Sequence, residues 1–191
     1  KMKQIKKIKK IVILVYIASI FSACTDNDNP VVINEEELIT TVRATLVPQN
    51  GGTTVTLESI DLDGDGPNEP VISVSGGFDQ NTTYAGSLLI LNDTESPADN
   101  ITLEILEEDE EHQFFFSSTN NIATTTYNDQ DSNGNPIGVE FSLLTGNSGY
   151  GAFTITLRHE PNKSGMDVNT GDITNAGGET DVQVIFDITV N

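Results

Sequence analysis

The chain of 191 residues contains one cysteine, no tryptophan and few basic residues, with nine lysines and arginines against 29 aspartates and glutamates. A single cysteine excludes a disulfide within the chain. Neither the G-x-S-x-G nucleophile elbow nor a glycine-rich phosphate loop occurs in it. These absences argue against the common hydrolase and nucleotide-binding classes, and they indicate a protein that is not an enzyme.

The basic residues are concentrated at the start, where six lysines fall within residues 1–10. An apolar run follows at 11–21, and the small residues of the tripeptide SAC come next, at 22–24. A basic start, a short apolar run and small residues before a cut are typical of a secretory signal. The run is shorter than the roughly 20 apolar residues that a bilayer-crossing helix needs. We therefore predict a signal peptide at residues 1–23.

The tripeptide SAC resembles a lipobox, the motif at which bacterial lipoprotein precursors are cut before a cysteine. The resemblance implies that Cys24 becomes the first residue of the mature protein and carries acyl chains on its sulfur and its amino group. Several acyl chains hold a protein on a membrane, at about 0.8 kcal/mol per buried methylene. An ordinary secretory signal followed by a chance cysteine is the alternative interpretation.

Removal of residues 1–23 would leave a strongly acidic protein. Only Arg43, Arg158 and Lys163 would stay basic, so the formal charge would be 3 − 29 = −26. Nucleic acid is not an expected partner, because binding to phosphates needs clustered lysine and arginine. An acidic surface attracts cations instead.

Residues 24–37 are polar and acidic, and we predict that they form a tether between the lipid and one folded domain at 38–191. In that domain the apolar residues recur mainly at every second position, as in TTVTLES, VEFSLLT, AFTITLR and DVQVIFDITV. This pattern predicts an all-β fold, an immunoglobulin-like or related β-sandwich of about seven to nine strands. At 98–116, ADNITLEILEEDEEHQFFF, we expect two strands around an acidic turn, with a short helix as the alternative.

Two halves of the domain resemble each other. DLDGDGP at 61–67 aligns with DQDSNGNP at 129–136, and further blocks follow in the same order. This order predicts an internal repeat of residues 45–118 and 119–190, each half with about four strands. Their apolar faces would pack together as the sandwich. The expected core residues are Leu57, Val74, Leu89, Leu91, Phe115, Phe141, Phe153, Ile155, Leu157, Val184 and Phe186.

The element D-x-D-x-[DN]-G occurs twice, at 61–66 and 129–134. Residues 129–140 fit the whole EF-hand loop pattern, but Pro136 and the strand-like residues after the loop do not fit an EF-hand. Oxygen ligands on alternate residues before a glycine can still wrap a calcium ion. Alternatively, both loops are acidic turns whose side chains cap their own backbone. The candidate calcium ligands are Asp61, Asp63, Asp65, Asp129, Asp131 and Asn133.

The only two histidines are a second candidate site. His112 follows an acidic run, and His159 precedes Glu160. Imidazole and carboxylate together suit zinc or copper, and both histidines are expected at strand ends. The alternative is two surface histidines in contact with glutamates, since most histidines of an acidic protein have acidic neighbours.

The lipobox, the acidic tether and the blocks EEHQFFF and LRHEPNKSG together resemble a group of outer-membrane lipoproteins of the Bacteroidota. Such proteins are often associated with TonB-dependent receptors. The resemblance implies a lipid anchor in the bacterial outer membrane, on either its periplasmic or its outer face. We expect a non-enzymatic accessory protein that binds a small ligand or a metal ion for an uptake receptor. A structural or adhesive surface module stiffened by calcium is the alternative.

Overall fold

The computed structural model describes residues 38–64 and 66–191. These residues belong to a compact unit that runs from Glu36 to Asn191. The predicted signal peptide, the lipidated Cys24, the tether and Asp65 lie outside the described residues. Among the described residues, the main core and the hydrophobic residues packed against it run from Ile39 to Val190.

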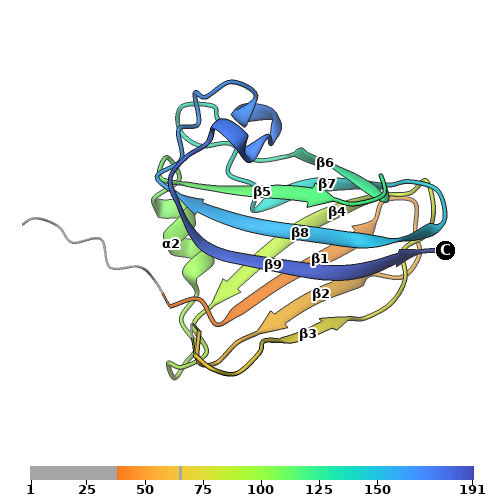
Figure 1. Cartoon of the computed structure of the whole chain (residues 1–191), viewed down its shortest axis with the longest axis horizontal. Helices are drawn as coiled ribbons and strands as arrows, with labels where there is room; N and C mark the ends of the chain where they lie inside the picture. Colours follow the sequence, from red (N-terminus) through yellow and green to blue (C-terminus); the bar gives the residue numbers. More distant parts are fainter. Residues whose placement is uncertain (1–37, 65) are drawn as a thin grey trace, which may run out of the picture. The chain divides into compact units, whose positions relative to one another are not determined.

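The described residues form nine strands in two antiparallel sheets (Figure 1). The larger sheet has the order β3-β2-β1-β4-β7-β6, and the smaller one has the order β5-β8-β9. The larger sheet consists of β1 (Thr41–Pro48), β2 (Val55–Ile60), β3 (Val71–Val74), β4 (Thr83–Leu91), β6 (Ala123–Tyr127) and β7 (Glu140–Thr145). The smaller sheet consists of β5 (His112–Ser118), β8 (Gly149–His159) and β9 (Glu179–Val190).

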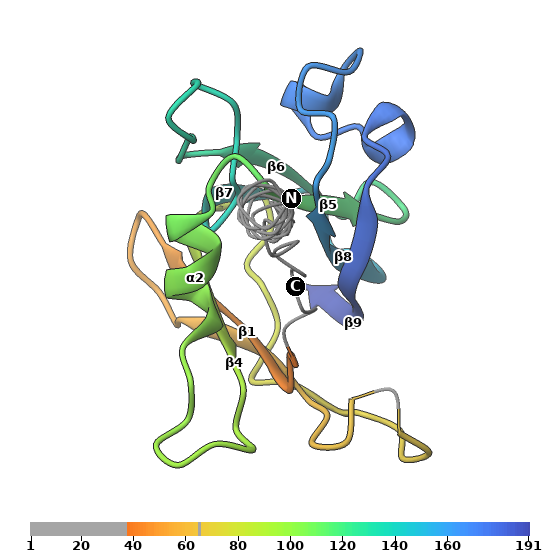
Figure 2. The same ribbon diagram turned by 90° about the vertical axis from the view of Figure 1, so that its left-hand side faces the viewer.

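The two sheets are the two layers of a β-sandwich, as Figure 2 shows from the side. Strand β9 illustrates why the sequence folds this way, because Val184, Phe186, Ile188 and Val190 are buried while the residues between them are exposed. Side chains of a strand alternate between its two faces, so this pattern presents one apolar face to the other sheet. The predicted all-β sandwich is confirmed.

Most of the expected core residues are buried in one cluster between the sheets, and three are only half-buried. The prediction was wrong for Leu89 and Leu91, because β4 turns the opposite face inward and buries Tyr84, Leu88 and Ile90. All four residues of the run LLIL are apolar, so the sequence does not show which face of this strand points to the core. Two further expected residues lie elsewhere: Val74 packs half-buried at the margin of the core, and Phe115 belongs to a second small cluster with Val168 and Ala176.

The stretch before β5 is a helix, α2 (Ile101–Glu107), and the strand predicted there was wrong. Ile101 and Ile105 are buried one helical turn apart, whereas Leu103 is exposed. The Thr102 hydroxyl accepts a hydrogen bond from the Ile90 backbone N–H at 2.7 Å and so fixes the helix against β4. The other helical segments of the described residues are the 3-10 turns η1 (Val168–Thr170) and η2 (Ile173–Asn175). None of the described helices is long and apolar enough to cross a membrane.

The two halves proposed as a repeat contribute to both sheets. The larger sheet takes β1 to β4 from the first half and β6 and β7 from the second, and the smaller sheet takes β5 from the first half with β8 and β9 from the second. After β1, the first half runs through the hairpin β2-β3, the strand β4, the helix α2 and the strand β5, and the second half follows the same order with β6-β7, β8, the 3-10 turns and β9. The aligned tyrosines differ, since Tyr84 is buried and Tyr150 is exposed. The repeat itself stays a prediction.

Candidate metal centre

The three strands of the smaller sheet bring both histidines together at one end of the sandwich. His112 begins β5 and His159 ends β8, and the two residues are directly opposite each other in the antiparallel pair. Their rings stack with centroids 4.9 Å apart and planes inclined by 12°. Residues opposite each other on antiparallel strands share a face of the sheet, so the pairing follows from the register. Residues 47 positions apart in the sequence thus become neighbours.

A β-bulge places a carboxylate beside the histidines. Strand β9 pairs with β8 through Leu157↔Val182 and Arg158↔Thr180, so Asp181 is the extra residue between the two pairs. A bulge re-aims the side chain of the extra residue and is frequent beside functional sites. The ligand atoms of His112, His159 and Asp181 all lie within 4.8 Å of one another.

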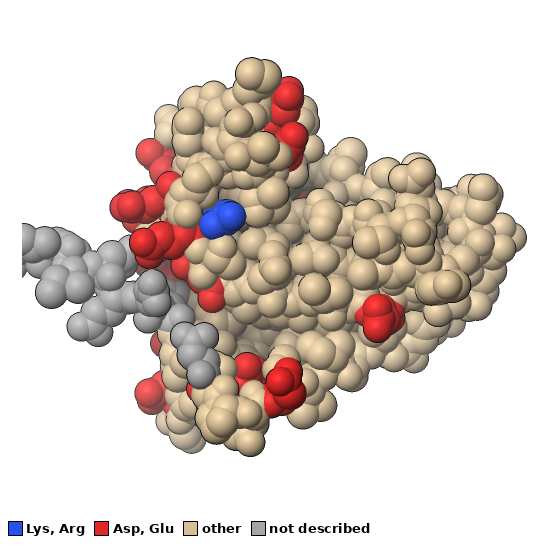
Figure 3. Space-filling view, viewed as in Figure 1, with Lys and Arg blue, Asp and Glu red and all other residues tan. Residues whose placement is uncertain are grey.

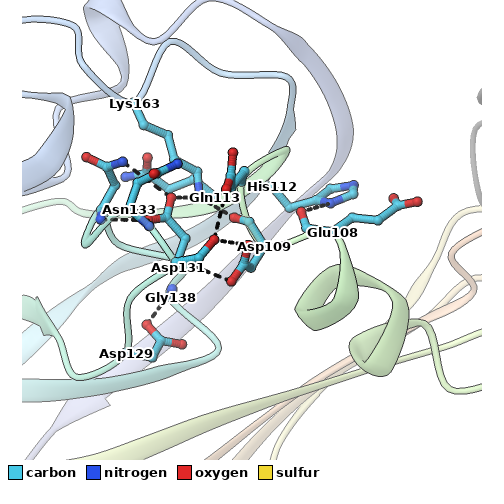
Figure 4. Close-up of polar contacts among 12 residues, drawn as sticks. Glu108, Asp109, His112, Gln113, Asp129, Asp131, Asn133, Gly138 and Lys163 are labelled. Atoms are coloured by element: carbon cyan, nitrogen blue, oxygen red, sulfur yellow. Dashed lines mark hydrogen bonds and ion pairs between the residues drawn. The ribbon is translucent and has the colours of Figure 1, made fainter.

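His112 is held in the form that can bind a metal. Its Nδ1 lies 3.2 Å from the backbone carbonyl oxygen of Glu108, just after α2 (Figure 4). A carbonyl oxygen can only accept a hydrogen bond, so Nδ1 carries the proton and Nε2 presents its lone pair. Burial is the main cause that lowers the pKa of His112, and the neighbouring His159 lowers it further; together they outweigh the Glu108 carbonyl and the charges of Glu108 and Glu111, which raise it. The ring is therefore neutral at neutral pH, as a ligand must be.

The chemistry of the three side chains suits a divalent transition metal. Two imidazoles and one carboxylate are common ligands of zinc, and imidazole also suits copper. Ligand atoms on a tetrahedral zinc ion at about 2.0 to 2.2 Å lie roughly 3.3 to 3.6 Å apart. The observed limit of 4.8 Å is wider, and the two imidazole rings are stacked with planes inclined by only 12°, so one ring must rotate out of the stack for both lone pairs to meet at one ion. Three protein ligands leave at least one position for water or for an exchanging ligand.

A second set of ligands adjoins the first. Glu111, His159 and Glu160 also present ligand atoms within 4.8 Å of one another, and His159 Nε2 lies 3.9 Å from Glu111 Oε2. The Glu160 backbone N–H donates to the Glu111 carbonyl oxygen at 2.6 Å, which extends the pairing of β5 and β8 beyond the histidines. Figure 3 shows acidic side chains gathered at this end of the sandwich, where α2 lies and β9 begins.

The loop at 129–135 is built as a capped turn. The Asp129 carboxylate accepts from the backbone N–H groups of Gly138 at 2.7 Å and Glu140 at 2.8 Å. Asp131 Oδ1 accepts from the backbone N–H groups of Asn133 at 2.9 Å and Asn135 at 2.8 Å. This geometry favours the interpretation as an acidic turn over a calcium site, because the oxygens are already engaged by donors.

A lysine from a distant part of the chain supplies a cation to the same loop. Lys163 Nζ lies 3.0 Å from Asp131 Oδ2, and both side chains are buried, with 5% and 1% of their surface exposed (Figure 4). The ammonium also donates to the Asp109 carbonyl oxygen. Burial alone would raise the pKa of Asp131, but hydrogen bonds from Asn135 and the charge of Lys163 outweigh it and lower the pKa. The lysine therefore already neutralises Asp131, one of the three candidate calcium ligands of this loop.

The loop at 61–66 is only partly described, since Asp65 is outside the described residues. The Asp63 carboxylate accepts from the side chain of Asn68 at 2.7 Å. Asp61 lines a groove of about 720 Å³, together with Glu69 and Asp181. Its Oδ1 is buried and makes no hydrogen bond within the described part of the chain.

Of the five residues in the two ligand sets, the sequence identified His112, His159 and Glu160 but neither Asp181 nor Glu111. His112 and His159 lie together, and Glu160 joins His159 in the outer set. Asp181 was missed, because the alternation of β9 places it on the opposite face to Val182 and only the bulge redirects it. A bulge of this kind leaves no pattern in a single sequence.

Comparisons with protein-family models, with curated proteins and with solved structures find no match.

Proposed function

We propose that this chain is a non-enzymatic outer-membrane lipoprotein that binds a zinc or copper ion and supplies it to a membrane uptake receptor of the TonB-dependent kind. The observation that carries the proposal is the cluster of His112, His159 and Asp181 at the end of the smaller sheet. Support for the anchor comes from the lipobox-like sequence before Cys24.

Three properties of the cluster support binding of a metal that can be released again. The hydrogen bond to the Glu108 carbonyl oxygen holds the proton on Nδ1 of His112 and leaves the lone pair of Nε2 for coordination, and burial lowers the pKa of the ring. His159 lies at the surface end of the sheet, with 14% of its side chain exposed, so an ion reaches it without opening of the core. Three protein ligands leave a coordination position through which a receptor or a chelator can take over the ion.

The direct test uses residues 24–191 with the substitution Cys24→Ser, a protein that contains the whole compact unit. Titration with zinc and with copper, followed by native mass spectrometry, should show one tightly bound ion per chain. His112→Ala and His159→Ala should each weaken binding by about tenfold to a hundredfold or more. The double variant His112→Ala/His159→Ala controls for loose binding to the acidic surface.

Two results would contradict this role. The parent protein could hold no ion beyond what the double histidine variant holds, or the single histidine variants could bind as tightly as the parent. The anchor is tested separately by fractionation of cells that express the full chain. We expect the wild-type protein in the outer membrane and the Cys24→Ser protein in the soluble fraction.

The calcium-stiffened surface module is a second candidate function, and one observation favours it. Asp61 Oδ1 is buried without a hydrogen bond within the described residues, and a cation would satisfy it. On this alternative, millimolar calcium raises the melting temperature and magnesium does not, because a ligand that binds only the folded state stabilises it. Asp61→Asn should abolish the effect and Asp129→Asn should leave it. A melting temperature that calcium does not change would remove this alternative.

A further inference from the structure

His159 belongs to two sets of metal-ligating side chains that differ in exposure. On one side it shares an inner set with His112 and Asp181, and on the other it shares an outer set with Glu111 and Glu160. The His112 residue is 6% exposed, the His159 side chain 14% and the Glu111 side chain 52%. The ligands therefore follow a path from solvent to the buried end of the sheet.

The two sets also differ in chemistry. The outer set has two carboxylates and one imidazole, and the inner set has two imidazoles and one carboxylate. Carboxylates bind many divalent ions and compete poorly for zinc or copper against nitrogen ligands, so the inner set holds these ions more tightly. A cation that approaches the acidic end meets the exposed carboxylates first, since negative charge raises the local concentration of cations.

We propose that Glu111, His159 and Glu160 form a loading station, at which a divalent transition-metal ion is captured before it moves to His112, His159 and Asp181. His159 stays bound throughout, while the carboxylates of Glu111 and Glu160 are exchanged for the His112 imidazole and the Asp181 carboxylate. The ion keeps its charge and no bond other than coordination changes. The inference depends on the proposed function, because it requires the inner set to bind metal.

The backbone keeps the loading station in register with the inner set. Glu160 directly follows His159, and its N–H is fixed to the Glu111 carbonyl oxygen at 2.6 Å. Glu160 has a φ of +48°, a left-handed conformation that is unfavourable for a residue with a β-carbon. A glutamate in a conformation that glycine or asparagine would adopt more easily is consistent with a role for its carboxylate.

The test compares the rate of metal loading with the affinity at equilibrium. Zinc is offered to the protein of residues 24–191 with Cys24→Ser as its complex with a chromophoric chelator, and transfer is followed by stopped-flow absorbance. The parent protein is compared with Glu111→Gln/Glu160→Gln. A matched control, Glu107→Gln/Glu110→Gln, removes two charges from the same acidic segment but outside both ligand sets.

We expect Glu111→Gln/Glu160→Gln to slow zinc transfer by roughly tenfold, as expected for loss of a local capture site. The affinity for one zinc ion should change by less than about threefold, which is small beside the roughly tenfold to hundredfold expected for loss of a supporting metal ligand. The control Glu107→Gln/Glu110→Gln should transfer zinc within about twofold of the parent rate, since the attraction of the whole acidic surface for cations changes little.

Three outcomes overturn the inference and are distinguishable. An unchanged transfer rate in Glu111→Gln/Glu160→Gln means that no loading station exists. A loss of affinity as large as in His112→Ala means that the glutamates belong to a single site. A parent protein that takes no zinc from the chelator, at concentrations at which zinc alone does not bind either, overturns the proposed function itself.

Discussion

Two acidic regions lie close together in this protein and use their carboxylates differently. In the loop at 129–135, Asp131 is buried against Lys163 and against the backbone N–H groups of its own turn. At the end of the smaller sheet, the carboxylates of Asp181, Glu111 and Glu160 lie beside two imidazoles. The comparison indicates that clustered acidic residues are candidates for a metal site where imidazole nitrogens join them, and for a structural turn where an ammonium and backbone N–H groups do.

We expect the largest effect, a loss of stability, when the internal cation Lys163 is removed. Lys163→Met leaves the Asp131 carboxylate buried without its partner, and breaking a buried pair in this way costs about 3 to 5 kcal/mol. Urea unfolding at pH 7 should show this as a lower midpoint. Zinc affinity measured on the folded fraction should not change. An unaltered urea midpoint would mean that the loop does not depend on the lysine.

A smaller effect is expected from the carboxylate on the bulge. Asp181→Asn keeps the size of the side chain and removes a charged ligand, so zinc should bind about tenfold to a hundredfold more weakly. Asp187→Asn on the same strand is the matched control, because it removes one charge from an exposed position outside both ligand sets. Calorimetric titration measures both variants. Equal affinities for the two would exclude Asp181 as a ligand.

The position of His159 also depends on a glycine across the sheet. A β-carbon at Gly178 would lie 2.2 Å from the His159 carbonyl oxygen, whereas one at Gly177 would meet nothing within 4 Å. Both glycines have positive φ, so Gly177→Ala carries the same backbone strain without the collision. We expect Gly178→Ala to weaken zinc binding by roughly tenfold more than Gly177→Ala does, because it displaces a ligand. Similar affinities would show that the end of β8 tolerates the shift.

We expect the smallest effect from pH, which changes the contribution of the Asp131 carboxylate to the free energy of unfolding. The pKa of Asp131 is lowered in the folded protein, so its contribution to stability is present above the ordinary value of 3.8 and is lost as the pH falls through the lower folded value. The difference in unfolding free energy between the wild type and Asp131→Asn should therefore stay constant from pH 7 to pH 5 and shrink below pH 3.8. A difference that already shrinks between pH 7 and pH 5 would mean that another group is responsible.

The sequence predicts the fold well because β8 and β9 alternate apolar and polar residues, which shows which face is buried. The prediction from sequence fails where the same residues fit two patterns. Ile101, Leu103 and Ile105 fit a strand, but Ile101 and Ile105 alone fit a helix, and packing against β4 selects the helix. The phase of β4 was equally undetermined, since both of its faces are apolar.

The candidate site was only partly predictable for a similar reason. The two histidines are conspicuous because the chain has no others, but their pairing depends on the register of β5 and β8. The bulge at Asp181 and the contact of Lys163 with Asp131, 32 residues apart, depend on the tertiary structure. Calcium was suggested for residues 129–134 because the sequence does not show that Lys163 brings a positive charge to this loop from a distant turn.

The most direct test of the central claim is the nitrogen-15 NMR spectrum of the two imidazoles before and after addition of one equivalent of zinc to the Cys24→Ser protein. The account predicts that the Nε2 resonance of His112 shifts to the range of a metal-bound nitrogen, that Nδ1 of the same ring stays protonated against Glu108, and that one nitrogen of His159 shifts in parallel. Imidazole resonances that do not move, with zinc taken up elsewhere on the acidic surface, would contradict it.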